Sequence, residues 1–305
     1  MLTRFSILFS VLYLTGPAFA SHWKYDNEES WAALCLTGKK QSPIALNEFI
    51  ATKKDYHPFN LVGYGQINTA LLKNNGHSAE VRLHSSAEVP TVTGGGLIGT
   101  YKLDHLHFHW QSEHTMSNYR FPLELHLVHY NEKYSNLTEA AQHTHGIAVL
   151  GVLFDLSPDD DEDFKPLLEI IASLKETTNE HKVLTDFSVK NFVPRDKAGF
   201  YRYEGSLTTP GCNEGVIWTL FTSTLPISKK QVKIFEAIQT EEKTTLTKNY
   251  RSLQPLNGRE VYLRVSPIRE NNGNIQTWTF PVALSILCNV LYSLGNIQKI
   301  YNSEC

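Results

Sequence analysis

Histidines are concentrated in one part of this chain, because six of the 13 fall within residues 105–129. Three of them alternate with other residues and would share one face of a β-strand: His105, His107 and His109. A second segment places His126 two residues after Glu124, so the carboxylate could orient the ring on the same strand face. Three neutral imidazoles from two adjacent strands suit catalytic zinc, because the fourth tetrahedral position stays open for water. The spacing predicts a three-histidine zinc site but leaves open which two of the first three histidines bind the metal.

These histidines need strands to position them, and the surrounding sequence supplies strand patterns. Short alternating apolar segments separated by polar turns recur along the chain, at residues 79–83, 102–110, 123–130, 147–154 and 216–221. Helical patterns are fewer, one around Leu167–Ile171 and one around Lys229–Ile238. No linker or repeat divides residues 21–266. The sequence therefore predicts one β-dominated α+β domain with short peripheral helices.

Composition excludes several other classes of protein. The chain has 305 residues, 41% of them hydrophobic, which is typical of a globular protein with a substantial core. The formal net charge is −3, with 19% charged residues, so there is no overall attraction to nucleic acid. We expect no nucleic-acid partner, and the sequence does not identify a protein partner.

The N-terminus predicts export. Arg4, the apolar run Phe5–Leu14 and the small-residue motif Ala18–Ala20 are typical of a signal peptide at residues 1–20, cleaved after Ala20. Of the four cysteines, two lie in the predicted domain, and in an oxidising compartment the simplest expectation is one disulfide, Cys35–Cys212. Asn136, in the sequon Asn-Leu-Thr, is a candidate glycosylation site.

The C-terminal region, residues 267–305, predicts membrane attachment. A polar spacer precedes 17 uncharged residues, Trp278–Leu294, which would span only about 25 Å as a helix. A glycolipid-anchor signal, a short transmembrane helix and a core helix are the alternatives, and the polar stretch Gly295–Cys305 is unusual for an anchor signal. We expect a cell-surface protein attached by one of the first two.

Beyond these local patterns, the sequence resembles the α-class carbonic anhydrases, of the secreted or membrane-anchored type. The resemblance covers nearly all of residues 22–266, and the motifs occur in the family's order. They are Trp23 and Tyr25, Gln41–Ile44, Asn74–His77, His107–Trp110, Ser112–Thr115, Glu124–His129, Gly146–Gly151, Gly205–Pro210, Asn249–Arg251 and Gln254–Leu256. It implies a large, mostly antiparallel twisted sheet with zinc at the base of a conical cleft.

The resemblance also implies a zinc lyase that reversibly hydrates CO2 to bicarbonate and a proton by zinc-hydroxide attack. It assigns the metal ligands as His107, His109 and His126. His105 stands where the family usually has Gln and would hydrogen-bond the first ligand, while Glu124 would orient the third. Asn249 belongs to the same supporting shell.

The remaining roles are carried over in the same way. Thr208 would accept a hydrogen bond from the zinc-bound hydroxide and donate one to Glu113. His77 matches the proton-shuttle position, and Tyr25 and Asn75 match positions that order water in the cleft. The residues that would surround the substrate are Val128, Val149, Leu207, Thr208, Thr209 and Trp218. The positions of Cys35 and Cys212 match the disulfide of exported members.

The sequence departs from the family pattern at two places in the predicted site, which leaves other functions as alternatives. The segment Trp110–Glu113 is shorter than usual, which could displace Glu113 or simply trim a turn, and Glu80 replaces a neutral polar residue at the cleft. Catalytically silent relatives act as binding domains, but usually after losing a ligand, and all three are present here. A different zinc hydrolase is disfavoured because His-Glu-x-x-His is absent.

Overall fold

The structure is a computed structural model and describes residues 23–84, 88–176, 181–266, 268–269 and 275–276. The predicted signal peptide at residues 1–20 lies outside these residues, and so does the apolar segment at 278–294. Within the described part of the chain, no helix is both long and apolar enough to cross a membrane.

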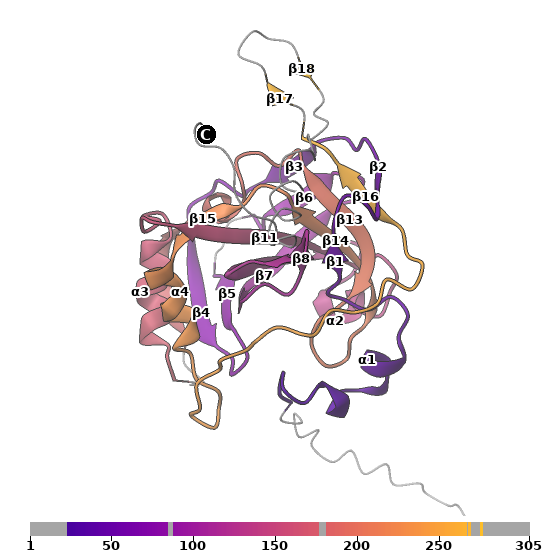
Figure 1. The fold of residues 1–305 in the computed structure, drawn as a ribbon. Coiled ribbons are helices and arrows are strands. Elements are labelled where there is room, and N and C mark those ends of the chain that lie inside the picture. The colour runs from indigo at the N-terminus through magenta and orange to yellow at the C-terminus, as the bar shows by residue number, and fades with distance from the viewer. Residues whose placement is uncertain (1–22, 85–87, 177–180, 267, 270–274, 277–305) are drawn as a thin grey trace, which may run out of the picture.

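One large sheet dominates the described residues (Figure 1). Its main path runs in the order β12-β4-β5-β7-β10-β11-β14-β13-β16-β2, with β15, β3 and β6 at its margins. The 13 strands are β2 (Ala51–Lys53), β3 (Phe59–Val62), β4 (Asn68–Asn74), β5 (Ala79–Leu83), β6 (Thr91–Gly94), β7 (Tyr101–Trp110), β10 (Leu123–Asn131), β11 (Ile147–Ser157), β12 (Lys182–Phe187), β13 (Phe200–Ser206), β14 (Glu214–Phe221), β15 (Leu225–Ser228) and β16 (Val261–Arg264). Neighbouring strands are antiparallel except where β11 meets β14 and β15 and where β16 meets β2.

Two smaller sheets lie apart from it. One contains β1 (Ala45–Leu46), β8 (Thr115–Met116) and β9 (Tyr119–Arg120), and the other pairs β17 (Ile268–Arg269) with β18 (Ile275–Gln276).

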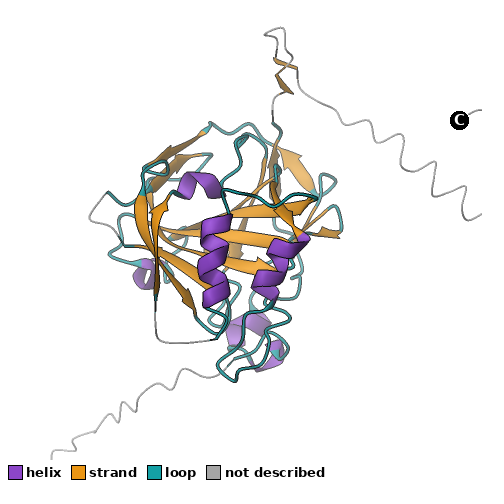
Figure 2. Cartoon of the chain, turned by 90° about the vertical axis from the view of Figure 1, so that its left-hand side faces the viewer, coloured by secondary structure: helices purple, strands orange, loops and turns teal. Residues whose placement is uncertain are grey.

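The helices are short and peripheral. They are α1 (Ala33–Thr37), α2 (Leu137–Ala140), α3 (Lys165–Ser173) and α4 (Lys229–Glu236), with 3-10 turns η1 (Glu28–Ser30) and η2 (Val189–Phe192). The α3 and α4 helices lie side by side against one face of the sheet (Figures 1 and 2). Helix α4 begins at a capping box, in which Ser228 and Gln231 satisfy each other's backbone N–H groups.

Alternation along the central strands divides the core in two. On β11, Ala148 and Leu150 belong to the apolar cluster beneath α3 and α4, whereas Ile147 and Val149 belong to a second cluster on the opposite face. Most of β10 and the first eight residues of β11 are buried, because both faces of these strands are covered there. The histidines His107 and His126 have the parity of the second face, so the site opens away from the helices.

The predicted fold class, β-dominated α+β with a large, mostly antiparallel sheet and short peripheral helices, is confirmed. Each of the five predicted strands is present within a few residues of its expected bounds, and so are both predicted helices. Local periodicity located these elements well because their buried faces are strongly apolar.

Candidate metal centre and active site

The pairing of β7 with β10 brings the predicted zinc ligands together. In this antiparallel ladder His126 lies directly opposite His107, and Glu124 lies opposite His109. Directly opposed side chains on one face are close neighbours. Donor atoms of the three histidines all lie within 4.8 Å of one another, with 3.2 Å between His126 Nδ1 and His107 Nε2.

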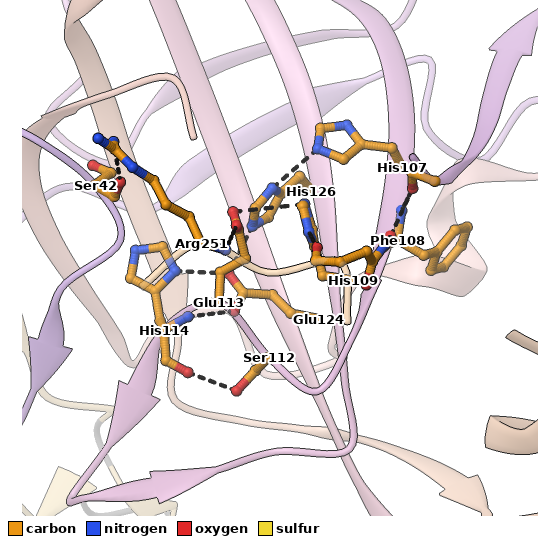
Figure 3. A network of polar contacts seen from close by, with 12 residues as sticks. Ser42, His107, Phe108, His109, Ser112, Glu113, His114, Glu124, His126 and Arg251 are labelled. Atoms are coloured by element: carbon orange, nitrogen blue, oxygen red, sulfur yellow. Dashed lines mark hydrogen bonds and ion pairs between the residues drawn. The ribbon is translucent and has the colours of Figure 1, made fainter. Parts of the chain in front are cut away.

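Two of the three ligand rings are fixed by hydrogen bonds from their outward nitrogens (Figure 3). His109 Nδ1 donates to the carbonyl of Asn249 at 2.6 Å, and His126 Nε2 donates to Glu124 Oε1 at 2.7 Å. These bonds set the tautomers, so that His109 Nε2 and His126 Nδ1 turn lone pairs toward the common point. His109 Nε2 is buried and has no hydrogen-bond partner among the described residues.

Burial keeps two of these rings neutral. Burial lowers the pKa of His107 well below its ordinary value, and His109 and His126 lower it further. The pKa of His109 is also lowered by burial, although Glu113 opposes the shift. Three imidazoles with converging ring nitrogens, one of them buried and unpartnered among the described residues, fit zinc, which binds this donor set tetrahedrally with one position open.

His105 is not where the resemblance implied. Its Nδ1 donates to Asp104 Oδ2 at 2.7 Å, and its ring stacks on His107 with ring centres 5.1 Å apart. His107 Nδ1 is buried and unpartnered in the part of the chain that the structure describes. The expected hydrogen bond from His105 to the first ligand is therefore absent, because a neighbouring carboxylate binds His105 instead.

The shortened segment before Glu113 forms a tight turn that keeps the carboxylate buried. The Ser112 hydroxyl donates to the His114 carbonyl and accepts from Phe121 N, which closes the turn. Glu113 is fully buried, and its Oε1 accepts from Arg251 N at 2.9 Å. The turn is therefore trimmed without expelling Glu113 from the site.

The expected hydrogen bond between Thr208 and Glu113 is not formed. Glu113 Oε2 lies 3.6 Å from His109 Nε2 and has no hydrogen-bond partner within the described residues. One carboxylate oxygen is thus engaged by the backbone of Arg251, and the other remains an available acceptor.

A supporting network behind Glu124 was not predicted from the sequence. His114 Nδ1 donates to Glu124 Oε1 at 2.7 Å (Figure 3). His114 Nε2 lies 2.7 Å from the Tyr203 hydroxyl, which in turn donates to Ser42. Burial alone would raise the pKa of Glu124, but His114 and His126 outweigh it and hold the pKa well below its ordinary value. His114 belongs to the histidine-rich stretch and to a family motif, which was the available signal, whereas nothing local marked Tyr203.

The metal centre lies at a cleft of about 280 Å³. Its walls contain the predicted substrate residues Val128, Val149, Leu207, Thr208, Thr209 and Trp218, and also Tyr25, Asn75, His77, His105, His107 and His126. Glu80 lines it too, as the resemblance implied, and so do Leu137 and Trp23, whose contribution was not predicted. His109, Glu113, Glu124 and Asn249 are fully buried and do not line the cleft, so the cleft joins an apolar wall to a buried polar base.

The turn that carries His77 is tied to the metal centre by Asn249. The Asn249 side-chain amide donates to the carbonyls of His77 at 3.1 Å and Phe108 at 2.8 Å, and its Oδ1 accepts from Trp110 N at 2.8 Å. The His77 ring stacks on Trp23, with 3.8 Å between ring centres.

The disulfide Cys35–Cys212 is present, as predicted, and joins residues 177 positions apart. Arg251 donates from Nη2 to the Cys35 carbonyl, and Gln41 donates to the Cys212 carbonyl. A disulfide of this kind is typical of proteins that pass through the secretory pathway.

Comparisons with known proteins agree with this geometry. The family model described as eukaryotic-type carbonic anhydrase matches residues 20–265. "Putative carbonic anhydrase 5" of Caenorhabditis elegans is 36% identical over 280 residues, covering 86% of this chain and 89% of the relative. "Carbonic anhydrase 4" of Rattus norvegicus is 32% identical over 282 residues, covering 84% and 88% respectively. "Carbonic anhydrase 6" of Bos taurus is 32% identical over 265 residues, covering 82% and 78%.

The fold and a three-histidine centre thus define a zinc lyase. The chain belongs to the eukaryotic-type carbonic anhydrase family, and its activity is that of a carbonic anhydrase.

Proposed function

We propose that this protein reversibly hydrates CO2 to bicarbonate and a proton, with zinc held by His107, His109 and His126. The convergence of three imidazoles at the cleft, with ring nitrogens within 4.8 Å of one another, is the observation that carries this proposal. When bound there, zinc would supply the Lewis-acid chemistry by which carbonic anhydrases are known to make water nucleophilic near neutral pH. The chain's own residues hold the metal, bind the substrate and move the proton.

The apolar wall of the cleft binds the substrate. CO2 is uncharged, so Val128, Val149, Leu207 and Trp218 can hold it without desolvating a charge, whereas a bicarbonate product gains nothing from them. The Thr208 hydroxyl orients the attacking oxygen, and Glu113 keeps a buried Oε2 as the acceptor that this role requires. Thr209 lies beside Thr208 on the same wall.

His77 carries the released proton from the cleft to solution. It lines the cleft and is partly exposed, and imidazole is suited to the task because its ordinary pKa lies near neutrality. Tyr25 and Asn75 line the same path and order its water. We expect His77→Ala to lower turnover and added imidazole to restore most of it; a variant with normal turnover would exclude His77 as the shuttle.

The metal assignment is tested by stopped-flow CO2 hydration together with metal analysis of the purified protein. We expect about one zinc per chain in the wild type, and loss of both zinc and hydration activity in His107→Ala. His105→Gln is the matched control and should keep activity. Equal loss in both variants would show that the ligands are wrongly assigned, and zinc without hydration activity would favour a binding domain.

We also propose that residues 1–20 are removed on export, that residues 21–266 form the catalytic domain and that residues 267–305 attach it to the cell surface. The disulfide and the apolar segment Trp278–Leu294 support this. Release by a glycolipid-cleaving phospholipase would indicate a lipid anchor, whereas extraction only by detergent would indicate a short transmembrane helix.

Asn136 is proposed to carry an N-linked glycan. It is exposed at the N-cap of α2, where its Oδ1 accepts from Glu139 N at 2.9 Å and leaves Nδ2, the atom that a glycan modifies, toward Ser135. Thr138→Ala keeps this cap and removes the sequon, so it should abolish a glycosidase-sensitive mass difference without destabilising α2.

A further inference from the structure

The three proposed zinc ligands are not equally supported. The outward nitrogens of His109 and His126 each donate to an oxygen within 2.7 Å, whereas His107 Nδ1 is buried and unpartnered among the described residues. The ring of His105 stacks on His107 and could provide a partner, yet its Nδ1 donates to Asp104.

A bulge in β7 places Asp104 beside His105. In the ladder with β10, His105 pairs with Val128 but Leu103 pairs with His129, so Asp104 is an extra residue without a partner. Such a bulge re-aims the adjoining side chains. Asp104 and His105 are consecutive, yet both are only partly buried, with side-chain exposures of 17% and 13%, whereas Leu103 and Leu106 on either side belong to the core beneath the helices.

Asp104 is itself held in place by an ion pair. Arg82 on β5 donates from Nη1 to Asp104 Oδ2 at 2.8 Å, and from Nε to Glu80 Oε1 at 2.6 Å. The same Asp104 oxygen thus accepts from both Arg82 and His105. A charge-assisted bond to a carboxylate fixed in this way is stronger than a neutral bond between two imidazoles, so His105 stays turned toward Asp104.

We propose that Asp104 is a positioning residue that holds His105 away from His107. His107 is thereby left without a supporting hydrogen bond, which weakens zinc binding by this ligand. The inference rests on the proposed zinc site. Hydrogen-bond partners of ligating histidines typically contribute about 10–100-fold to metal affinity. Freeing His105 to bind His107 should therefore slow zinc loss by about tenfold or more.

Zinc loss to an excess of a coloured chelator tests this without relying on activity. Asp104→Ala should release zinc at least about tenfold more slowly than the wild type. Glu80→Ala is the matched control, because it removes the other carboxylate bound to Arg82 but does not touch His105, and it should release zinc at the wild-type rate. Thermal unfolding of each metal-free variant verifies that it folds.

A second variant isolates the route through His105. His105→Gln places an amide oxygen where it can accept from His107 Nδ1, so it should also slow zinc loss, and adding Asp104→Ala to it should have no further effect. If Asp104→Ala fails to fold, His105→Gln alone still tests the proposal, because zinc loss at the wild-type rate would overturn the claim that the missing partner of His107 weakens zinc binding.

The outcomes separate the two proposals. A wild-type protein that binds no zinc would refute the proposed metal site itself. Zinc bound by the wild type but lost at the same rate or faster from Asp104→Ala would overturn the role of Asp104. The role of Asp104 would also be overturned if Glu80→Ala slowed zinc loss equally, or if Asp104→Ala had an undiminished effect on zinc loss in the His105→Gln background. In either case the effect would come from removing a negative charge near the cleft and not from His105.

Discussion

Asn249 links the metal centre to the turn that carries His77, and replacing it with alanine should affect the turn without affecting the metal. Its backbone carbonyl, which any residue supplies, accepts from the ligand His109. Its side chain instead holds the carbonyls of His77 and Phe108 and the N–H of Trp110. Asn249→Ala should therefore keep zinc while loosening the turn that carries His77.

The cost in stability follows from what each lost bond leaves behind. The buried Trp110 N–H loses its partner, which costs about 1–3 kcal/mol. Phe108 retains the Ser78 hydroxyl as a donor at 2.6 Å, so losing Asn249 costs it only the net value of a hydrogen bond. With the bond to His77, the total is about 3 kcal/mol in the free energy of unfolding.

Three measurements check this reasoning: denaturant unfolding, zinc retention against a chelator, and stopped-flow hydration with and without imidazole. We expect lower stability, wild-type zinc retention, and a loss of turnover that imidazole restores. The loss should be smaller than the roughly hundredfold that a well-placed general acid–base group contributes.

Asn131→Ala is the control for this variant. Asn131 is also buried, and its side chain bonds to Ile98 and Lys133 rather than to residues of the metal centre, so its loss should lower stability alone. The reasoning would be refuted if Asn249→Ala lost zinc, or if it lost stability without any imidazole-sensitive change in turnover. Either result would contradict the assignment of metal support to the Asn249 backbone and of the His77 turn to its side chain.

Three further predictions concern stability and metal affinity. Burial lowers the pKa of His129 to about 4, so as the pH falls the unfolded state binds a proton at this residue before the folded state does. The free energy of unfolding should therefore fall by about 3 kcal/mol between pH 6.5 and 4. In His129→Gln the pH dependence of unfolding should be shallower by about one proton, and an unchanged slope would contradict this. Removing the disulfide Cys35–Cys212, which closes 177 residues, should cost up to about 5 kcal/mol, measured by denaturation of oxidised and reduced protein. Glu124→Gln should weaken zinc binding by about tenfold or more in chelator competition, because it removes the charge that His114 and His126 share; unaltered affinity would argue against that support.

The sequence alone determined which residues could share a face. Alternation is a local property of an extended backbone, so the common orientation of His107 and His109, and of Glu124 and His126, follows from their spacing. The strongly apolar patterns of the central strands made the strand positions predictable for the same reason. The cysteine count and the resemblance likewise indicated the disulfide before any geometry was known.

Only the tertiary structure decided how those faces meet. Strand register places His126 opposite His107, and register depends on how the whole sheet packs. Other supporting contacts join distant segments, Asn249 lying 140 residues from the ligand His109 and Tyr203 lying 89 residues from His114, so no local pattern could reveal them. The bulge at Asp104 turned His105 from the expected support of His107 into the partner of a carboxylate, because an extra residue in one strand re-aims the adjoining side chains.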